Sequence, residues 1–323
     1  MKIILTGSSG FVGRELSKTL FEIGHSLIGI DRVNCKNNYL SEFVCVDLST
    51  MDSKKDKVFL KYGPVDLLIN CAAAKGDYDI SADDFDRDNV KASQGLLKLM
   101  ENLKIQNVIH YSTVSVYGHD NIRFDEKAEL NPNNDYGKTK LEAEEIFLDW
   151  FNLRPKRNLT ILRPSVIYGE NSYTNLYNLL AFLNRPIVVS IGNGRNVKSM
   201  ISLENMINIT LFAINKKGLN IYNCTDSPHY TIKELIEIIC ELREFNKPLL
   251  FIPLYVAYII AIPFELFSKL LNQDLKISRE RFYKFSKATD YRSELLRTEE
   301  YIQVYSPKER IHSFAKWFLK EKL

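Results

Sequence analysis

The sequence predicts an α/β fold in which a doubly wound parallel sheet is followed by a smaller, mixed C-terminal lobe. Strand and helix patterns alternate through the first half of the 323-residue chain. This alternation is typical of a parallel sheet covered by helices. The first strand leads directly into a glycine-rich turn, and after residues 163–164 the elements become shorter and mixed. We therefore expect a first domain at 1–163 and a substrate-binding lobe at 164–323.

The N-terminal stretch combines a strand, a turn and a helix. Residues 3–6 are apolar or β-branched, and they precede T-G-x-x-G-x-x-G and a helical apolar pattern that reaches residue 23. Gly7 permits a tight turn, Gly10 lets a pyrophosphate approach the backbone, and Gly13 lets the helix pack close to the strand. The helix N-terminus offers N–H groups to the phosphates. These features predict a Rossmann-type dinucleotide domain, with an ordinary glycine-rich turn as the alternative.

The remaining elements of the first domain continue this pattern. The second strand, 26–31, ends at Asp31, 18 residues after Gly13, where dinucleotide folds place the carboxylate that binds the adenosine ribose. A carboxylate there repels a 2′-phosphate and favours NAD over NADP, whereas the neighbouring Arg32 weakens this preference. A turn residue at a strand end is the alternative role for Asp31. Further strands are expected at 43–46, 65–70, 107–111 and 159–162, and helices at 83–103 and 136–151.

The second half contains one strongly apolar segment. Residues 249–267 are mostly apolar, but Pro253, Pro263 and Glu265 argue against a membrane-spanning helix. We expect a short strand and then a helix that covers the substrate site, with weak membrane-surface contact through 254–267 as a further hypothesis. The other elements expected in the lobe are strands at 187–191 and 220–224 and helices at 203–214, 232–242 and 311–320.

The composition argues against several classes of function. The net charge of +3 is small for this length, and no basic run suggests a nucleic-acid partner. The five cysteines are odd in number and contain no C-x-x-C, which argues against a metal site or a disulfide framework and favours reduced thiols. The N-terminal apolar run is too short for a signal peptide. We therefore expect a cytoplasmic protein.

The strongest chemical motif is Tyr136-Gly-Lys-Thr-Lys140, because residues four apart share one helix face. An ordinary tyrosine has a pKa of ~10, and a nearby ammonium together with a positive nicotinamide ring favours the phenolate needed for proton transfer. A hydroxyl of Ser112 or Thr113 can bind the same substrate oxygen. A solvated helix surface is the alternative, but the position 23 residues after Thr113 favours catalysis.

With these motifs the chain resembles the extended short-chain dehydrogenases/reductases of the NAD-dependent epimerase/dehydratase family. The resemblance implies a catalytic triad of Thr113, Tyr136 and Lys140, NAD as cofactor, and a homodimer formed through helices near 83–104 and 136–151. Matching stretches lie at 6–13, 31, 47–48, 71–75, 89, 112–118, 136–140 and 162–164. The implied cofactor-binding residues are Gly7, Gly10, Phe11, Val12, Gly13, Asp31, Arg32, Asp47, Leu48, Ala72, Ala73, Lys75, Asn89, Ser112, Tyr136 and Lys140.

Residues beyond the triad reduce the number of reaction types that the resemblance allows. Nucleotide-sugar 4,6-dehydratases of this family carry an Asp-Glu pair after the catalytic threonine, whereas Val114-Ser115 stand there in this chain and cannot supply the acid and base of an elimination. We expect an NAD-dependent nucleotide-sugar epimerase or 4-ketoreductase of surface polysaccharide synthesis. Arg195 and Asn178 are candidates to bind the substrate diphosphate, with a surface arginine as the alternative for Arg195. A hydroxysteroid or dihydroflavonol-type dehydrogenase and a non-catalytic cofactor-binding regulator are the alternative functions.

Overall fold

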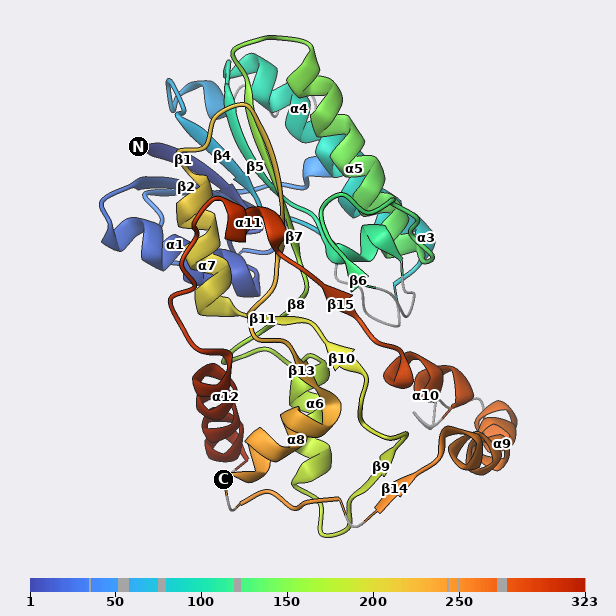
Figure 1. Cartoon of the computed structure of the whole chain (residues 1–323). Coiled ribbons are helices and arrows are strands. Elements are labelled where there is room, and N and C mark those ends of the chain that lie inside the picture. Colours follow the sequence, from blue (N-terminus) through green and yellow to red (C-terminus); the bar gives the residue numbers. More distant parts are fainter. Residues whose placement is uncertain are drawn as a thin grey trace.

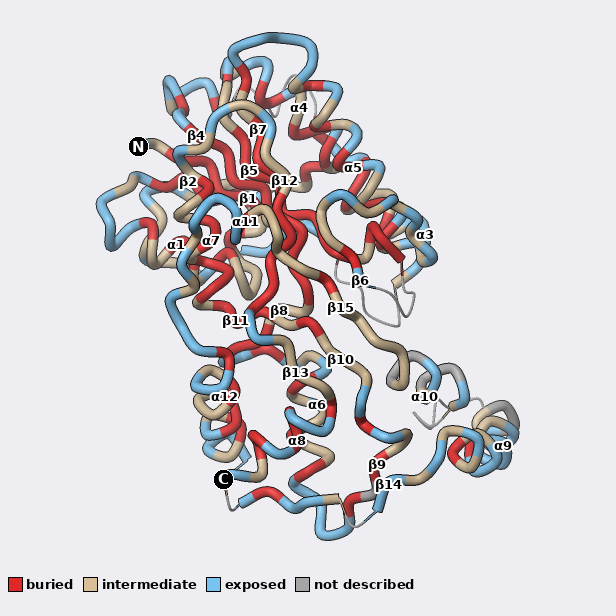
Figure 2. Tube along the Cα trace, in the orientation of Figure 1, coloured by how far each residue is buried: buried red, intermediate tan, exposed pale blue. Residues whose placement is uncertain are grey.

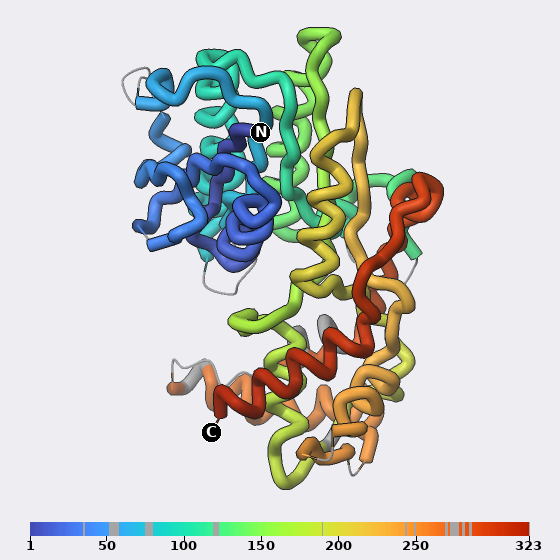
Figure 3. The backbone as a smooth tube through the Cα atoms, turned by 90° about the vertical axis from the view of Figure 1, so that its left-hand side faces the viewer, coloured from blue at the N-terminus to red at the C-terminus, as the bar shows by residue number. Residues whose placement is uncertain are grey.

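The computed structural model describes residues 1–34, 36–51, 58–74, 80–118, 123–242, 244–248, 250–271 and 278–322. A sheet covered by helices forms one end of the molecule, and a smaller lobe of helices and short strands forms the other (Figure 1). The N-terminus belongs to the sheet, whereas the C-terminus ends the helix that crosses the lobe (Figure 3).

A seven-stranded parallel sheet forms the centre of the first part, with strand order β12-β7-β5-β4-β1-β2-β3. This topology confirms the predicted doubly wound parallel sheet. The strands are β1 (Lys2–Thr6), β2 (Ser26–Asp31), β3 (Glu42–Cys45), β4 (Leu67–Asn70), β5 (Asn107–Tyr111), β7 (Asn158–Pro164) and β12 (Leu219–Cys224). The order reverses between β1 and β4, and open α/β sheets bind their ligands at the carboxyl ends of strands at such a reversal.

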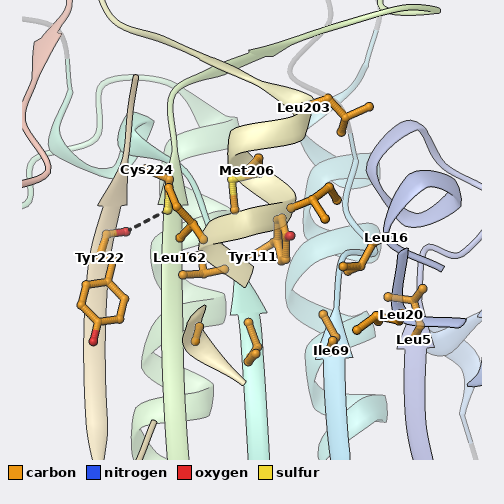
Figure 4. Close-up of a cluster of buried hydrophobic side chains, with 14 of the residues drawn as sticks. Leu5, Leu16, Leu20, Ile69, Tyr111, Leu162, Leu203, Met206, Tyr222 and Cys224 are labelled. Atoms are coloured by element: carbon orange, nitrogen blue, oxygen red, sulfur yellow. Dashed lines mark hydrogen bonds between the residues drawn. The ribbon is translucent and has the colours of Figure 1, made fainter. Parts of the chain in front are cut away.

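Helices cover both faces of the sheet because its buried strands present apolar side chains in both directions. On one face, Ile3 and Leu5 pack with α1 (Phe11–Glu22) and α7 (Leu203–Ala213); Figure 4 shows this cluster. On the other face, Ile4 packs with α4 (Ala92–Asn102) and α5 (Asp135–Asn152). Buried residues accordingly concentrate in the strands (Figure 2). Shorter elements near the carboxyl edge are η1 (Leu48–Thr50), α3 (Ala82–Phe85), η2 (Asp86–Lys91) and η3 (Val114–Tyr117).

The lobe has its own apolar core, to which three helices contribute: α6 (Asn175–Leu183), α8 (Ile232–Cys240) and α12 (Pro307–Glu321). Helix α8 begins with a capping box, in which Thr231 and Glu234 bind each other's backbone N–H. Pairs of short strands surround these helices. They are β8 (Val166–Tyr168) with β11 (Met200–Ser202), β10 (Val197–Lys198) with β13 (Tyr230–Thr231), β9 (Val189–Ile191) with β14 (Leu250–Ile252), and β6 (Arg123–Phe124) with β15 (Asp290–Tyr291).

The chain returns from the lobe to the sheet, which corrects one prediction. The strand predicted at 220–224 was expected in the lobe. In the structure, β12 pairs in parallel with β7 over residues 219–224 and forms the edge of the main sheet. Helix α7, also expected in the lobe, packs against α1, and α11 (Glu294–Thr298) packs on β12. The open edge of β7 binds this late strand because its backbone groups need partners. Residues after 163 therefore serve both parts.

The apolar segment forms a strand and a helix, as predicted. Strand β14 precedes α9 (Leu254–Leu271), which contains Pro263 and is followed by α10 (Arg279–Ser286). Among the described residues, no helix is both long and apolar enough to cross a membrane. Helices α9 and α10 lie beside the lobe, away from the main sheet (Figure 1).

Two glycines of the turn have different predicted roles, which substitution can distinguish: Gly13 for helix packing and Gly10 for the approach of a ligand. A Cβ at position 13 would lie 2.1 Å from the Gly7 carbonyl oxygen, whereas one at position 10 would lie 3.1 Å from the same atom. We expect Gly13→Ala to lower the free energy of unfolding by about 2 kcal/mol or more, because backbone must move to admit the methyl group. We expect Gly10→Ala to lower it by less than about 1 kcal/mol. Urea unfolding followed by circular dichroism measures both, and equal losses would contradict the assigned roles.

Candidate active site

The loops after β1 and β4 touch at the carboxyl edge of the sheet. Thr6 Oγ1 donates a hydrogen bond to Asn70 Oδ1 (2.6 Å) and accepts one from the Ala72 backbone N–H (3.2 Å). Gly7 has φ +66°, and a Cβ there would lie 2.8 Å from the Ala72 nitrogen. The turn at Gly7 is therefore tight, as predicted, and requires glycine both for its backbone angle and for this approach.

The N-terminus of α1 opens on this turn. Gly10 is its N-cap, and no side chain caps the helix. Phe11 and Val12 are the first two helical residues, so their N–H groups have no partner within the helix. The Phe11 ring reaches toward the lobe, because a Cβ on Gly169 would lie 3.5 Å from its Cζ. This end of α1 suits an anion such as a pyrophosphate.

Asp31 and Arg32 point to different partners. Asp31 Oδ2 accepts a hydrogen bond from the Ser9 N–H of the glycine turn (3.0 Å), and Oδ1 accepts one from the Val33 N–H (3.0 Å). The end of β2 thus lies beside the glycine turn, where a ribose-binding carboxylate is expected. Arg32 Nη1 instead donates to Asp88 Oδ1 (2.7 Å), so its guanidinium is bound to the helical segment η2.

Asp47 and Leu48 have clear structural roles next to this frame. Asp47 caps η1, and its Oδ1 accepts from the Ser49 N–H (2.9 Å) and hydroxyl (2.7 Å). Burial raises the pKa of Asp47, but these hydrogen bonds and the charges of nearby arginines outweigh it, so the pKa is lowered. Leu48 is buried. After β4, Ala72 is half-buried and Ala73 exposed, while Lys75 lies outside the described residues.

Asn89 joins the loop after β4 to helix α5. Its Oδ1 accepts from the Ala74 N–H (3.1 Å) and its Nδ2 donates to Thr139 Oγ1 (3.0 Å). It lies in η2, a π-helical segment that interrupts the helix predicted at 83–103, and such segments often occur at functional sites. Both ends of its amide bind protein groups, so Asn89 holds the 71–74 loop in place. Its direct contact with a cofactor stays a prediction.

The structure brings Thr113 and Tyr136 together. Asn134 caps α5 by accepting from the Gly137 N–H (2.8 Å), which sets Tyr136 at the start of the helix. Burial raises the pKa of Tyr136, and a side-chain hydrogen bond with Thr113 partly opposes this. Thr113 caps η3 by accepting from the Ser115 N–H (3.1 Å). The tyrosine is half-buried rather than a solvated surface residue.

Lys140 lies on the same helix face, but its ammonium binds elsewhere than expected. Lys140 Nζ donates to the backbone carbonyl of Tyr111 at the end of β5. Burial lowers the pKa of Lys140 to about 8, against the opposing charges of Glu144 and Cys71. Burial raises the pKa of Tyr136, so the joint effect of this ammonium and a positive nicotinamide ring on the phenolate stays a prediction.

A buried ion pair stabilises this helix, and the sequence patterns did not indicate it. Arg163 Nε and Nη2 donate to the two carboxylate oxygens of Glu144 at 2.9 and 2.6 Å. Arg163 Nη1 also donates to the Tyr117 hydroxyl (2.7 Å), which donates to Asn223 Oδ1 (2.9 Å). One feature of the sequence could have indicated a charged partner inside the protein: Glu144 follows Lys140 by four residues and therefore lies on the same helix face. The network joins α5, η3, β7 and β12.

The other predicted residues lie at different depths. Ser112 is buried, and its hydroxyl has no hydrogen-bond partner among the described residues, which suits a residue that contacts a bound group. Asn178, on α6, and Arg195, just before β10, are exposed on the lobe. Their contact with a substrate diphosphate stays a prediction. No cluster of three or more His, Cys, Asp or Glu suited to a metal occurs in the described ranges.

Known proteins resemble this chain along most of its length. The sequence model of the NAD dependent epimerase/dehydratase family matches residues 3–225. The chain is 28% identical over 308 residues to N-acetyl-alpha-D-glucosaminyl-diphospho-ditrans,octacis-undecaprenol 4-epimerase of Escherichia coli O157:H7, covering 94% of this chain and 91% of that protein. It is 25% identical over 274 residues to UDP-glucose 4-epimerase of Dictyostelium discoideum, covering 73% and 79%. The solved UDP-glucuronic acid 4-epimerase from Bacillus cereus in complex with NAD has a TM-score of 0.76 at 18% identity, covering 100% of both chains.

The buried ion pair predicts a large effect of one neutral substitution. We expect Glu144→Gln to lower the free energy of unfolding by about 3 kcal/mol, because it leaves the buried Arg163 guanidinium without its counter-charge. Glu145→Gln is the matched control on the exposed side of α5, and we expect a change within about 0.5 kcal/mol. Chemical denaturation of both variants measures these changes. Similar stability of the two variants would show that the pair contributes little.

Proposed function

The chain belongs to the NAD dependent epimerase/dehydratase family, and we propose that it is an NAD-dependent 4-epimerase of diphosphate-linked sugars, nucleotide sugars first among them. The observation that carries this proposal is the position of Tyr136 at the start of α5, where the Thr113 side chain is near enough to oppose the effect of burial on its pKa, with Lys140 on the same helix face. These three residues suit hydrogen transfer at a carbinol carbon. The glycine turn and Asp31 at the carboxyl edge of the same sheet suit a dinucleotide.

Tyr136 is the proposed acid and base of the reaction. Its phenol oxygen accepts the proton of the sugar hydroxyl and later returns it, while the Thr113 hydroxyl orients the same sugar oxygen. Bound NAD would supply a hydride acceptor for the sugar carbon and, after reduction, the hydride donor for the other face of the keto sugar. Burial raises the pKa of Tyr136, so phenolate formation needs a positive charge nearby. The ammonium of Lys140, one helical turn further along the same face of α5, is the proposed source of that charge.

The described residues fit NAD. The uncapped start of α1 and the absent side chain at Gly10 leave room for a pyrophosphate. The unpartnered hydroxyl of Ser112 suits a contact with the bound cofactor. We favour NAD over NADP for two reasons. The Asp31 carboxylate lies beside the glycine turn, where it would repel a 2′-phosphate. The Arg32 guanidinium, which could bind such a phosphate, is hydrogen-bonded to Asp88 instead.

Epimerisation is favoured over net ketoreduction because the relatives and solved structures cited above are named as 4-epimerases. Dehydration is disfavoured by Val114-Ser115, since the Ser115 hydroxyl serves as a partner of Thr113. We propose that Arg195 and Asn178 bind the diphosphate from the lobe. The undecaprenol-linked substrate in the name of the E. coli relative supports a place in surface polysaccharide synthesis.

Three further features complete the proposal. We propose a homodimer through helices near 83–104 and 136–151, on the family resemblance. We place the enzyme in the cytoplasm, because the four described cysteines are free thiols. Membrane-surface contact through 254–267 stays a prediction, since a helix that does not span a bilayer can lie on one.

Substrate turnover tests the proposed reaction directly. Purified protein with NAD is incubated with UDP-glucose, UDP-galactose, UDP-N-acetylglucosamine and UDP-N-acetylgalactosamine, and the products are separated by chromatography. We expect interconversion of one 4-epimeric pair without net consumption of NAD. Tyr136→Phe should reduce turnover by at least about 10³-fold, because it removes the only proposed proton acceptor, and should leave NAD affinity nearly unchanged.

Other outcomes would decide against the proposal. Net oxidation of a hydroxysteroid with no sugar turnover would favour the apolar-alcohol dehydrogenase. NAD binding without turnover of these nucleotide sugars or of a lipid-linked sugar diphosphate would favour the non-catalytic regulator. Wild-type activity of the Tyr136→Phe variant would remove this residue from the mechanism.

The pKa of Lys140 predicts a falling limb in the pH profile. Because burial lowers this pKa to about 8, the ammonium is lost as pH rises through about 8, and we expect kcat/KM, which reports the free enzyme, to fall above that pH. The charge of Glu144 raises the pKa of Lys140, so Glu144→Gln should move the limb to lower pH. Glu145→Gln should leave it in place, and a limb insensitive to Glu144→Gln would assign it to another group.

A further inference from the structure

Helix α9 presents its large apolar side chains to solvent. Five of them, Tyr255, Ile259, Leu266, Phe267 and Leu271, are between 57 and 67% exposed; they define what we call the apolar face of α9. No charged residue occurs in 254–264 or 266–268. Single exposed apolar residues are ordinary, but a continuous patch on one helix marks an interaction surface.

The side of α9 that faces the protein has the opposite character. Ala257 and Ala261 are buried there, at 1 and 0% exposure. Four residues further along this stripe, Glu265 accepts hydrogen bonds from the backbone N–H (2.7 Å) and Nε (2.9 Å) of Arg279 at the start of α10. Residues four apart share a helix face, so this inner stripe is small and polar. A surface helix normally buries its apolar stripe, and α9 does the reverse.

Basic residues follow the apolar face in the sequence. Residues 269–287 contain six Lys or Arg against two Asp or Glu, and α10, within this stretch, packs against α9. Helices that lie in a membrane interface combine an apolar face with basic neighbours, because the first enters the acyl boundary and the second binds anionic headgroups. A second copy of the chain is a poorer occupant, because pairing two apolar faces would bring two basic segments together.

The α9–α10 pair is connected to the catalytic loop by a short path. The chain runs from α10 directly into β15, which pairs with β6. The Tyr291 hydroxyl of β15 donates to the carbonyl of Gly118 (2.8 Å), immediately after η3. Its ring lies 6.0 Å from that of Tyr117. A surface held by α9 is therefore tied to the segment that contains Thr113.

We propose that the apolar face of α9 lies in the interface of an anionic phospholipid bilayer and that the sugar diphosphate taken by this site is attached to a lipid in that bilayer. This inference rests on the proposed function, because it names the carrier of the sugar. The apolar face holds the enzyme at the membrane, and the exposed Arg195 of the lobe binds the diphosphate at the headgroup level. A nucleotide-linked sugar would need no such surface.

Vesicle binding tests the surface. The full chain is centrifuged with vesicles of phosphatidylglycerol and phosphatidylethanolamine in equal parts, and with vesicles of phosphatidylcholine alone. We expect co-sedimentation with the anionic vesicles and at least about tenfold weaker binding of Ile259→Glu/Leu266→Glu, since each substitution removes buried apolar area and adds a repelled charge. The matched control, Leu153→Glu/Ile302→Glu, changes two apolar residues that are 76 and 82% exposed elsewhere and should bind as wild type.

Turnover on the two carriers separates the inference from the proposed function. We expect the α9 variant to lose turnover of N-acetylglucosaminyl-diphospho-polyprenol in anionic vesicles while any turnover of soluble UDP-sugars stays at the wild-type level. No binding of wild type to vesicles, or equal binding of the α9 variant and the control, would overturn the inference. So would light scattering that shows a dimer converted to monomers by the α9 substitutions. Vesicle binding without turnover on either carrier would overturn the proposed function instead.

Discussion

The buried pair of Arg163 with Glu144 is the interaction on which the candidate site depends. Both side chains are almost fully removed from solvent, and such a pair is tolerated only when every polar atom finds a partner. Arg163 meets this condition with two carboxylate oxygens and the Tyr117 hydroxyl. Helix α5, which carries Tyr136, is thereby held against β7, which pairs directly with β5.

The same pair sets the electrostatics around Lys140. Glu144 stands one helical turn after Lys140 and opposes the effect of burial on its pKa. The Glu144 carboxylate forms its hydrogen bonds with Arg163 and acts on Lys140 only through its charge. The ammonium of Lys140 binds the backbone carbonyl of Tyr111 at the end of β5, which fixes the position of this charge relative to the sheet edge.

The second constraint is the close approach of the β1 and β4 loops. Gly7 permits this approach, and Thr6, Asn70 and Asn89 fix the loop backbones by hydrogen bonds. The proposed binding groups thus come from the glycine turn, and the proposed catalytic groups come from α5 and from the N-cap of η3. Segments late in the chain complete the arrangement, since Asn223 of β12 binds Tyr117 and Tyr291 of β15 binds the carbonyl of Gly118. A change at the lobe surface is in this way connected to the residues beside Thr113.

The sequence by itself determined the features that depend on neighbouring residues. Apolar runs predicted β1, β2, β5 and β7, the glycine spacing predicted the turn at Gly7, and the interval of four residues placed Tyr136 and Lys140 on one face. These patterns are readable because strand and helix geometry repeat over a few residues. Tertiary structure alone decided the return of β12 to the sheet, the ion pair of Glu144 with Arg163 and the binding of Lys140 to the Tyr111 carbonyl. It also decided which side of α9 faces solvent. Each of these depends on groups distant in the chain, and their pairing is settled only when the sheet assembles and buried polar atoms must find partners.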